Sequence, residues 1–323
     1  ANKKVGADEI PQIFAAYADT AYAIDQMGLA ANLDPYFTEE ELKAYVPGYL
    51  EEGRLDAEGH LKIFPTAKST EVLMLNKTDW DTFAAATGAS LSELETMEGV
   101  VRVSQKYYEW TDSLTDVPDD GKALFGRDAM ANYMVIGAKQ MGEDIFSVSD
   151  GQLTFGAGKE TLRRLWDCYY TPFVNGYFGA YGRFLACVGS TSSATYFPKE
   201  IVVSDTESHP IEVAVLEPPR FEGGKKVAVQ QGAGMVVTKS DEKTEYAAAL
   251  FLKWFTEADR NMEFVVDTGY MPVKTAANQV DKVQAYLQSA GASESLYDTL
   301  SVAVPMTQQY DMFTAKASKG GAS

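Results

Sequence analysis

The sequence predicts an α/β fold, and three observations lead to this prediction. The chain has 323 residues, of which 46% are hydrophobic and 12% aromatic, so it is long enough for a sizeable core and for two domains. Short apolar runs of strand length alternate with longer stretches of helical period. The stretch Gly232–Val273 contains the pattern once in full: a short strand, a capped helix, a shorter helix and a return to extended chain.

The first half of the chain opens with a strand and a helix. Ile10–Tyr17 is strand-like at its start and leads into an Ala-rich helix that ends at Met27, because Gly28 is a favourable C-terminal stop. Thr38, followed by three glutamates, predicts a capped helix start. The other elements expected in this half are strands at Leu61–Pro65 and Val72–Leu75 and helices at Leu91–Trp110 and Ala129–Met141.

The second half continues the alternation. Ser240 or Asp241 is the expected N-cap of the helix in the opening stretch. Trp166 and Trp254 each lie on an apolar helical stripe, which favours a place in the core, whereas Trp80 and Trp110 are open as pocket candidates. We further expect a helix at Lys159–Tyr170, strands at Phe184–Val188, Ile211–Leu216 and Val227–Gln231, a turn at Ser149–Gly151, and a frayed or cut polar end at Ala1–Glu9.

The chain is strongly acidic. Its 28 basic and 46 acidic residues give a net charge of −18, which argues against binding to nucleic-acid backbones and to anionic membrane surfaces. No apolar run approaches the roughly 18 residues of a membrane span. The chain opens without the charged and apolar regions of a signal peptide, so an export signal, if the protein is exported, is expected to have been removed.

No motif in the sequence predicts catalysis. The two histidines, His60 and His209, are expected in surface loops, and neither stands in a zinc-binding pattern, so we expect neither metal nor cofactor. Nucleophile-elbow, phosphate-loop and dinucleotide-binding patterns are absent from the sequence as well. Cys168 and Cys187 favour two free core thiols over a disulfide, although their spacing alone leaves a bridge open.

Four stretches in a fixed order carry a resemblance to a known family. They are GADEIPQIFAAYADTAYAIDQMGLAANLDPYF, then GHLKIFPTAKSTEVLMLNKTDW, then FLACVGSTSSATYF, and finally GAGMVVTKS with AAALFLKWFT and TGYMPV. Together they resemble family 1 extracellular solute-binding proteins, the carbohydrate-type receptors of ATP-binding-cassette importers, which include maltose- and glycerol-3-phosphate-type receptors. The match runs across most of Gly6–Ala277, and it lacks the first strand–helix unit and the last helices of the family.

The resemblance implies a two-lobed periplasmic-binding-protein architecture of type II whose hinge closes on a ligand. By position, the first lobe would comprise residues 1–80 and 231–277, and the second residues 81–230 and 278–323. The implied protein is a monomeric receptor, not an enzyme. It would bind a sugar, oligosaccharide or polyol and present it to a membrane permease, either in a periplasm or as a lipoprotein on the outer face of the cell membrane.

The same resemblance suggests ligand-binding residues. The polar piece Thr66–Thr70 between two strands is a candidate ligand loop, and an arginine–aspartate pair falls where the second lobe contributes another. Serines at a helix start can bind an oxygen-rich or anionic group, or simply cap the helix. The predicted ligand-binding set is Ser69, Thr70, Arg127, Asp128, Ser190, Ser192, Gly232, Ala233, Gly234 and Tyr270.

Three other functions stay open at this level. A phosphorylated ligand such as glycerol 3-phosphate is favoured only if Arg127 and the Ser190–Ser193 region converge. A ligand-binding domain of a sensor would have the same ligand site and a different partner. A carbohydrate-active hydrolase needs two carboxylates at a defined separation across a sugar, which a sequence does not show.

Overall fold

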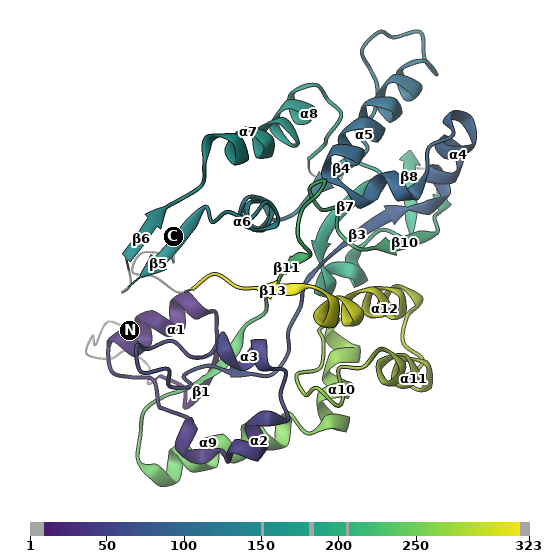
Figure 1. The fold of residues 1–323 in the computed structure, drawn as a ribbon. Coiled ribbons are helices and arrows are strands. Elements are labelled where there is room, and N and C mark those ends of the chain that lie inside the picture. The colour runs from purple at the N-terminus through teal and green to yellow at the C-terminus, as the bar shows by residue number, and fades with distance from the viewer. Residues whose placement is uncertain (1–9, 150–151, 181–183, 205–206, 317–323) are drawn as a thin grey trace.

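The computed structural model describes residues 10–149, 152–180, 184–204 and 207–316. The predicted frayed end at Ala1–Glu9 and the centre of the predicted turn, Asp150 and Gly151, lie outside these ranges. Figure 1 shows two regions of strands and helices, joined by extended segments that cross between them.

The central strand of the larger sheet is β3 (Glu71–Asn76), whose six residues are all buried. Its run of apolar residues suits a strand that is covered on both faces. The sheet has the order β10-β3-β7-β4, and only the β4–β7 pair is parallel. The other members are β4 (Phe125–Arg127), β7 (Ala186–Ser190) and β10 (Val213–Leu216).

Helices on one face of this sheet enclose the core of the second lobe. Leu73 and Leu75 of β3 pack there with Phe83, Val100 and Phe125. The predicted helix over Leu91–Trp110 is divided, because Thr96 is extended and caps a new helix by accepting from the backbone N–H of Gly99. The elements are α4 (Lys77–Thr87), the 3₁₀ helix η2 (Leu91–Glu95), α5 (Met97–Asp112), α6 (Met130–Gln140), α7 (Lys159–Asp167) and α8 (Tyr170–Val174).

The opposite face of the sheet is covered on its β10–β3 side. Val72 and Met74 of β3 pack in a second cluster with Val265 and Leu300. We use 'second lobe' for the part built on this sheet, which includes β3 and the helix α10 packed on it, although both fall within the ranges predicted for the first lobe. The predicted lobe boundaries at residues 80, 230 and 277 stay predictions. The covering elements are α10 (Ala258–Thr268), α11 (Val280–Ala290), α12 (Glu294–Gln309) and the 3₁₀ helix η3 (Thr191–Tyr196).

The first lobe is built on the sheet β1-β12-β2. Phe37, Phe64 and Leu252 belong to its core. The predicted capping box is present, since Thr38 and Glu41 each accept from the other's backbone N–H. The elements are β1 (Ile13–Ala16), α1 (Ala18–Gln26), the 3₁₀ helix η1 (Asp34–Tyr36), α2 (Glu39–Lys43), α3 (Pro47–Glu51), β2 (Phe64–Pro65), β12 (Gly234–Val237) and α9 (Glu242–Phe255).

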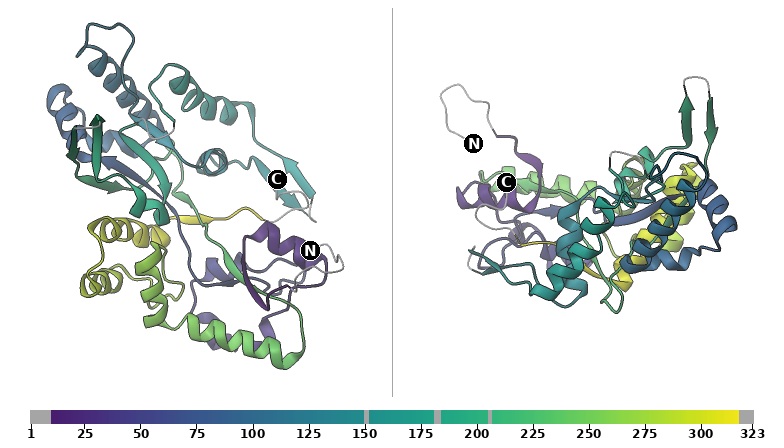
Figure 2. Two further views of the ribbon diagram at one scale, coloured as in Figure 1. Left: turned by 180° about the vertical axis from the view of Figure 1, so that it is seen from behind. Right: turned by 90° about the horizontal axis from the view of Figure 1, so that it is seen from above.

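Three further strand pairs lie outside these two sheets. Strands β11 (Val227–Val229) and β13 (Asp311–Phe313) pair in parallel between the two regions. Hairpins β5–β6 (Phe146–Ser149, Gln152–Phe155) and β8–β9 (Glu200–Ser204, Glu207–Pro210) complete the list. The right view of Figure 2 shows β8–β9 projecting away from the body of the molecule.

The tryptophans reverse the sequence-based expectation. Trp166 and Trp254, predicted to be core residues, are 54% and 48% exposed, whereas Trp80, a pocket candidate, is 2% exposed. Trp110 is half-buried and packs against the same core as Trp80. The prediction failed on α9 because this helix has apolar residues on more than one side, and its small residues, including Ala248 and Ala249, form the buried side. Periodicity alone does not decide which of two apolar sides faces inward.

Candidate functional site

The predicted residues of the two lobes meet where the chain crosses between the sheets. We call this region the crossing and define it as residues 66–71, 190–193, 229–234 and 269–271. Ser69 exchanges two backbone hydrogen bonds with Gln231, at 2.8 and 3.0 Å. Lys68 pairs with Met271 in the same way. Segments far apart in the sequence are thereby held side by side.

The predicted ligand loop at Thr66–Thr70 is a buried segment and not an exposed loop. Ser69 is 2% exposed and Thr70 is fully buried. The Thr70 hydroxyl donates to the carbonyl of Val229 at 2.7 Å, and the Thr70 carbonyl accepts from the N–H of Thr191 at 2.9 Å. These two residues therefore hold the crossing together through hydrogen bonds within the protein.

Two glycines at the crossing lie close to neighbouring backbone and side chains. Gly232 has a φ of +109°, and a Cβ there would lie 3.1 Å from the carbonyl oxygen of Ala67 and 3.4 Å from the Tyr270 ring. Tyr270 is half-buried beside it. A Cβ on Gly234 would lie 2.3 Å from the side chain of Ile63, so only glycine fits in β12 at that point. Ala233 between them is half-buried.

The serines at the start of η3 bond mainly to one another. The hydroxyls of Ser190 and Ser192 are 2.9 Å apart, and Ser190 also accepts from the N–H of Ser192. Ser193 donates to the carbonyl of Ser190 at 2.6 Å. A Cβ on Gly269 would lie 3.2 Å from the Cα of Ser192, so the segment leading to Tyr270 touches these serines. Helix capping and a ligand-facing position are both compatible with this geometry.

A buried polar network at the crossing includes three residues that the sequence analysis missed: Glu71, Asn132 and Gln231. Arg127 forms an ion pair with Glu71, and the two side chains are 5% and 6% exposed. Asn132 donates to the other Glu71 oxygen at 2.8 Å and to the Gln231 side chain at 3.2 Å. The guanidinium of Arg127 also donates to the carbonyl of Ala129 and lies 5.7 Å from the centre of the Tyr133 ring.

One sequence signal could have identified Glu71. It is a carboxylate placed directly before the apolar run Val72–Leu75, which the sequence predicts to be a strand. Buried carboxylates are rare unless they are paired. Asn132 and Gln231 carry no such signal, because polar residues of their type are common on surfaces.

A second buried ion pair lies on the first-lobe side of the crossing. The ammonium of Lys68 is 2.8 Å from Glu52 and 2.9 Å from the carbonyl of Gly232, and its side chain is 1% exposed. Burial lowers the pKa of Lys68, and the charge of Glu52 opposes this shift. The side chain of Gln230 donates to Glu52 at 2.7 Å and to the carbonyl of Gly48 at 3.1 Å.

Asp128 is the one exposed carboxylate of the predicted set. Its backbone N–H donates to the carbonyl of Val188 at 3.0 Å, which fixes its place just after β4. Within the described residues its carboxylate has no hydrogen-bond or ion-pair partner, so it is free to accept from a ligand. Arg127 and Asp128 both line a hollow of about 1440 Å³ in the second lobe, as does Ser193.

The cysteines are free, as the sequence predicts. Burial raises the pKa of the Cys168 thiol to about 12 and that of Cys187 to about 11. Because the thiolate is the reactive form, neither residue is set up as a nucleophile near neutral pH.

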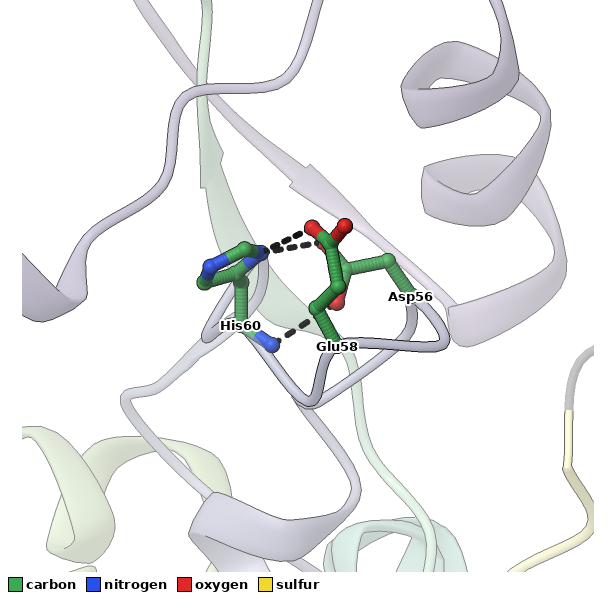
Figure 3. A group of neighbouring side chains, drawn as sticks. All are labelled: Asp56, Glu58 and His60. Carbon is green, nitrogen blue, oxygen red and sulfur yellow. Dashed lines mark hydrogen bonds and ion pairs between the residues drawn. The ribbon is translucent and has the colours of Figure 1, made fainter.

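A surface turn in the first lobe brings together three side chains of metal-binding type (Figure 3). Nδ1 of His60 lies 2.7 Å from Asp56 and 3.3 Å from Glu58, and the backbone N–H of His60 donates to Asp56 at 2.8 Å. Lys62 lies 3.7 Å from Asp56. The hydrogen bonds from His60 already satisfy the Asp56 carboxylate and the adjacent ammonium disfavours a cation, so this turn is a self-contained hydrogen-bonded unit. His209 lies in strand β9 and not in a loop as predicted.

Comparison with known proteins adds a family match. A family model described as bacterial extracellular solute-binding protein matches residues 1–290. No curated protein sequence matches the chain significantly. Within the described residues, no helix has both the length and the apolar character that crossing a membrane requires.

Solved structures match nearly the whole chain, at sequence identities that establish the fold alone. The cyclic alpha-maltosyl-1,6-maltose binding protein from Arthrobacter globiformis has a TM-score of 0.70 at 16% identity, over 93% of this chain and 73% of that one. UgpB from Mycobacterium tuberculosis, in complex with glycerophosphocholine, has a TM-score of 0.68 at 18% identity, over 95% and 74%. Maltose-bound MalE3 from T. maritima has a TM-score of 0.67 at 13% identity, over 95% and 75%. The predicted two-lobed α/β architecture is confirmed.

Proposed function

The chain belongs to the family of bacterial extracellular solute-binding proteins, and from this premise we propose that it binds a carbohydrate between its lobes for an ATP-binding-cassette importer. The resemblance found in the sequence is thereby confirmed at the level of the family. Membership also means that the protein works outside the cytoplasm. Whether it resides in a periplasm or is anchored as a lipoprotein stays part of the proposal, as does the identity of its permease.

The network around Glu71 is the observation that carries the proposal. It joins Arg127 and Asn132 of the second lobe to Gln231 in a segment that crosses to the first lobe. A ligand that bonds to this network contacts both lobes, so it would favour the closed arrangement by its differential affinity. Side chains with planar hydrogen-bonding groups suit the hydroxyls of a sugar.

The solved neighbours support a carbohydrate as the ligand class. Two of the three named above are described as binding maltose or a cyclic maltose derivative. Exposed aromatic rings that line the same hollow as Arg127 and Asp128, among them Trp166 and Tyr170, offer faces for the apolar surface of a bound ligand. The proposed ligand contacts are therefore Asp128, Arg127, Asn132 and the Ser190–Ser193 segment, joined by Tyr270.

The remaining predicted residues receive a different role in this proposal. Ser69, Thr70 and the Gly232–Gly234 segment would hold the hinge, because Ser69, Thr70 and both glycines are buried and the two polar residues bond within the protein. The resemblance predicted that these residues contact the ligand. We keep that prediction only for their backbone groups, which a hinge motion would expose.

A phosphorylated ligand is the second candidate, since UgpB is described in complex with glycerophosphocholine. The condition set from the sequence is met in part, because Arg127 and Ser193 line the same hollow. However, the guanidinium is already paired with Glu71, and the exposed Asp128 beside it would repel a phosphate. We therefore rank neutral sugars above phosphorylated ones.

The experiment that tests the proposal is a ligand screen followed by one pair of matched variants. Sugars, oligosaccharides, polyols and sugar phosphates are compared by thermal shift, and hits are titrated by calorimetry. Asp128→Asn should then weaken the best hit about tenfold or more, because a hydrogen bond to a charged group contributes about 1.5–3 kcal/mol. Asp116→Asn makes the same change at an exposed position that does not line the hollow and should leave the affinity unchanged.

Two outcomes would contradict the proposal. A shift with sugar phosphates and none with neutral sugars would replace the ligand class. Sustained release of chromophore from nitrophenyl glycosides by the purified protein would point to a hydrolase and end the proposal of binding without reaction.

A further inference from the structure

A hollow of about 1440 Å³ lies on a half-covered face of the second-lobe sheet. Met74, Cys187 and Gly189 form part of its floor and point to the same side of the sheet. Helix α12 contacts β10 and β3 on this side, so the β7–β4 half is left open. The resulting space of about 1440 Å³ exceeds the usual range for small-molecule pockets, about 300–1,000 Å³.

Exposed aromatic rings gather on the walls of this hollow. On the side of α7 and α8 are Trp166, Tyr170 and Phe173, which are 54%, 49% and 44% exposed, and the first two rings have centroids 3.9 Å apart. Tyr196, at the end of η3, also lines the hollow and is 84% exposed. Single exposed apolar residues are ordinary, but a group that surrounds one cavity marks a binding surface.

Three polar residues lie together at one end of the hollow. Arg127, Asp128 and Ser193 line the hollow where the strands end, beside the Glu71 network. Asn76, at the other end, is already used as the cap of α4 and is 4% exposed. The hollow therefore has a polar end next to the proposed sugar site and an apolar, aromatic body that leads away from it.

We propose that this hollow binds the apolar part of the transported solute, so that the ligand is an amphiphilic glycoside. This inference rests on the proposed function and specifies its substrate class. The sugar head lies at Asp128 and the Glu71 network, and an alkyl or aryl group lies against Trp166 and Tyr170. A second copy of the chain is a poor occupant, because each copy carries a net charge of −18 and the rim includes the carboxylates of Asp128 and Glu200.

A chain-length series tests the inference. Glucose, maltose and their methyl, butyl, hexyl and octyl β-glycosides are titrated by calorimetry at concentrations below those at which micelles form. The affinity should rise about three- to fourfold for each added methylene, the factor that burial of one such group contributes. The octyl glycosides, but not glucose, should displace the apolar dye 8-anilinonaphthalene-1-sulfonate. This displacement measures occupancy of the hollow independently of the sugar head.

Two matched tryptophans locate the effect. Trp166→Ala should flatten the dependence on chain length, because it removes one aromatic wall of the hollow. Trp254→Ala removes a similarly exposed tryptophan on α9, outside the hollow, and should leave the dependence intact. In the Trp254→Phe background, octyl glycosides should also shift the tryptophan emission to shorter wavelength as Trp166 leaves water.

The outcomes separate this inference from the proposed function. Sugars that bind with no gain from an alkyl chain and no dye displacement overturn the inference and leave the function standing. If the gain in affinity with alkyl chain length is unchanged in Trp166→Ala, the alkyl chain does not lie against Trp166, and the proposed location is wrong. A dimer in solution that Trp166→Glu converts to a monomer overturns it in favour of a second copy. Binding of octanol as tight as that of the octyl glycosides supports the hollow and contradicts the proposed carbohydrate function.

Discussion

At the scale of single residues, two buried ion pairs stand out on the two sides of the crossing. Lys68 with Glu52 and Arg127 with Glu71 each place two charges in side chains that are at most 8% exposed. Removing charges from water is costly, and the attraction within a pair offsets this only when further hydrogen bonds are present. Both pairs have them, from Gln230 in one case and from Asn132 in the other.

The first prediction concerns the Lys68 pair. Lys68→Met should lower the free energy of unfolding by about 3–5 kcal/mol, because it leaves Glu52 buried without its counter-charge. Adding Glu52→Gln should recover a large part of this loss. Lys43→Met, which breaks an exposed pair with Glu39, should cost about 1 kcal/mol or less. Urea unfolding at neutral pH measures all three, and equal losses for the two lysine variants would refute the argument.

The second prediction concerns pH. Partial burial opposes ionisation of Asp56, but the hydrogen bonds from His60 and the charge of Lys62 outweigh it and hold the pKa of Asp56 below its usual value. A carboxylate whose pKa is lowered in the folded state stabilises the fold at pH values above its unfolded pKa of about 3.9. This stabilisation is lost as the pH falls from about 5 through the lowered pKa. Asp56→Asn should therefore flatten the fall of Tm in acid, whereas Asp116→Asn should not. Parallel curves of Tm against pH for Asp56→Asn and the unmodified protein would contradict this prediction.

At the scale of elements, three helices end in the same way. Helices α4, α10 and α11 are each followed by a glycine with φ between +65° and +71°: Gly88, Gly269 and Gly291. This is the left-handed cap that glycine adopts without strain. Only Gly269 has non-local neighbours, since a Cβ there would lie 3.1 Å from the Thr191 carbonyl oxygen.

The third prediction uses this contrast. Gly291→Ala should cost about 1–2 kcal/mol of stability, the strain of an L-residue in the left-handed region. Gly269→Ala should cost more and should also weaken ligand binding, because its Cβ would displace Thr191 and Ser192 at the crossing. Urea unfolding and calorimetric titration of the best ligand measure the two effects. Unchanged affinity in Gly269→Ala would show that η3 does not contribute to the site.

At the scale of the whole molecule, two adjacent glutamines, Gln230 and Gln231, connect the two lobes. Gln230 bonds to Gly48 and Glu52 in the first lobe, and Gln231 bonds to Asn132 in the second. The two residues are adjacent in a crossing segment, so a rotation between the lobes changes both sets of contacts together. This is the arrangement expected of a hinge that absorbs motion at a few positions.

The fourth prediction is that a ligand closes this hinge. Saturation with the best ligand should lower the radius of gyration measured by small-angle scattering, because a ligand that contacts both lobes favours the closed state. The same ligand at 100 times its Kd should raise the free energy of unfolding by about 2.7 kcal/mol. Stabilisation of this size with an unchanged radius of gyration would mean that binding occurs within one lobe.

Local signals in the sequence were sufficient to predict the family and many of the helix ends and strands. The Thr38 cap of α2, the Asp241 cap of α9 and Gly28 after α1 were predictable because each acts within one or two turns of chain. The order of four stretches was sufficient to indicate the family, which the match over residues 1–290 confirms.

Only the tertiary structure decided which side chains face a ligand and which are buried. It placed Trp80 in the core and Trp166 on the wall of a hollow, and it joined Glu71, Asn132 and Gln231 into one network. In the network, Asn132 is 61 residues from Glu71 and 99 residues from Gln231 in the chain. Exposure and pairing at such separations follow from how whole elements pack, and no local pattern of residues contains that information.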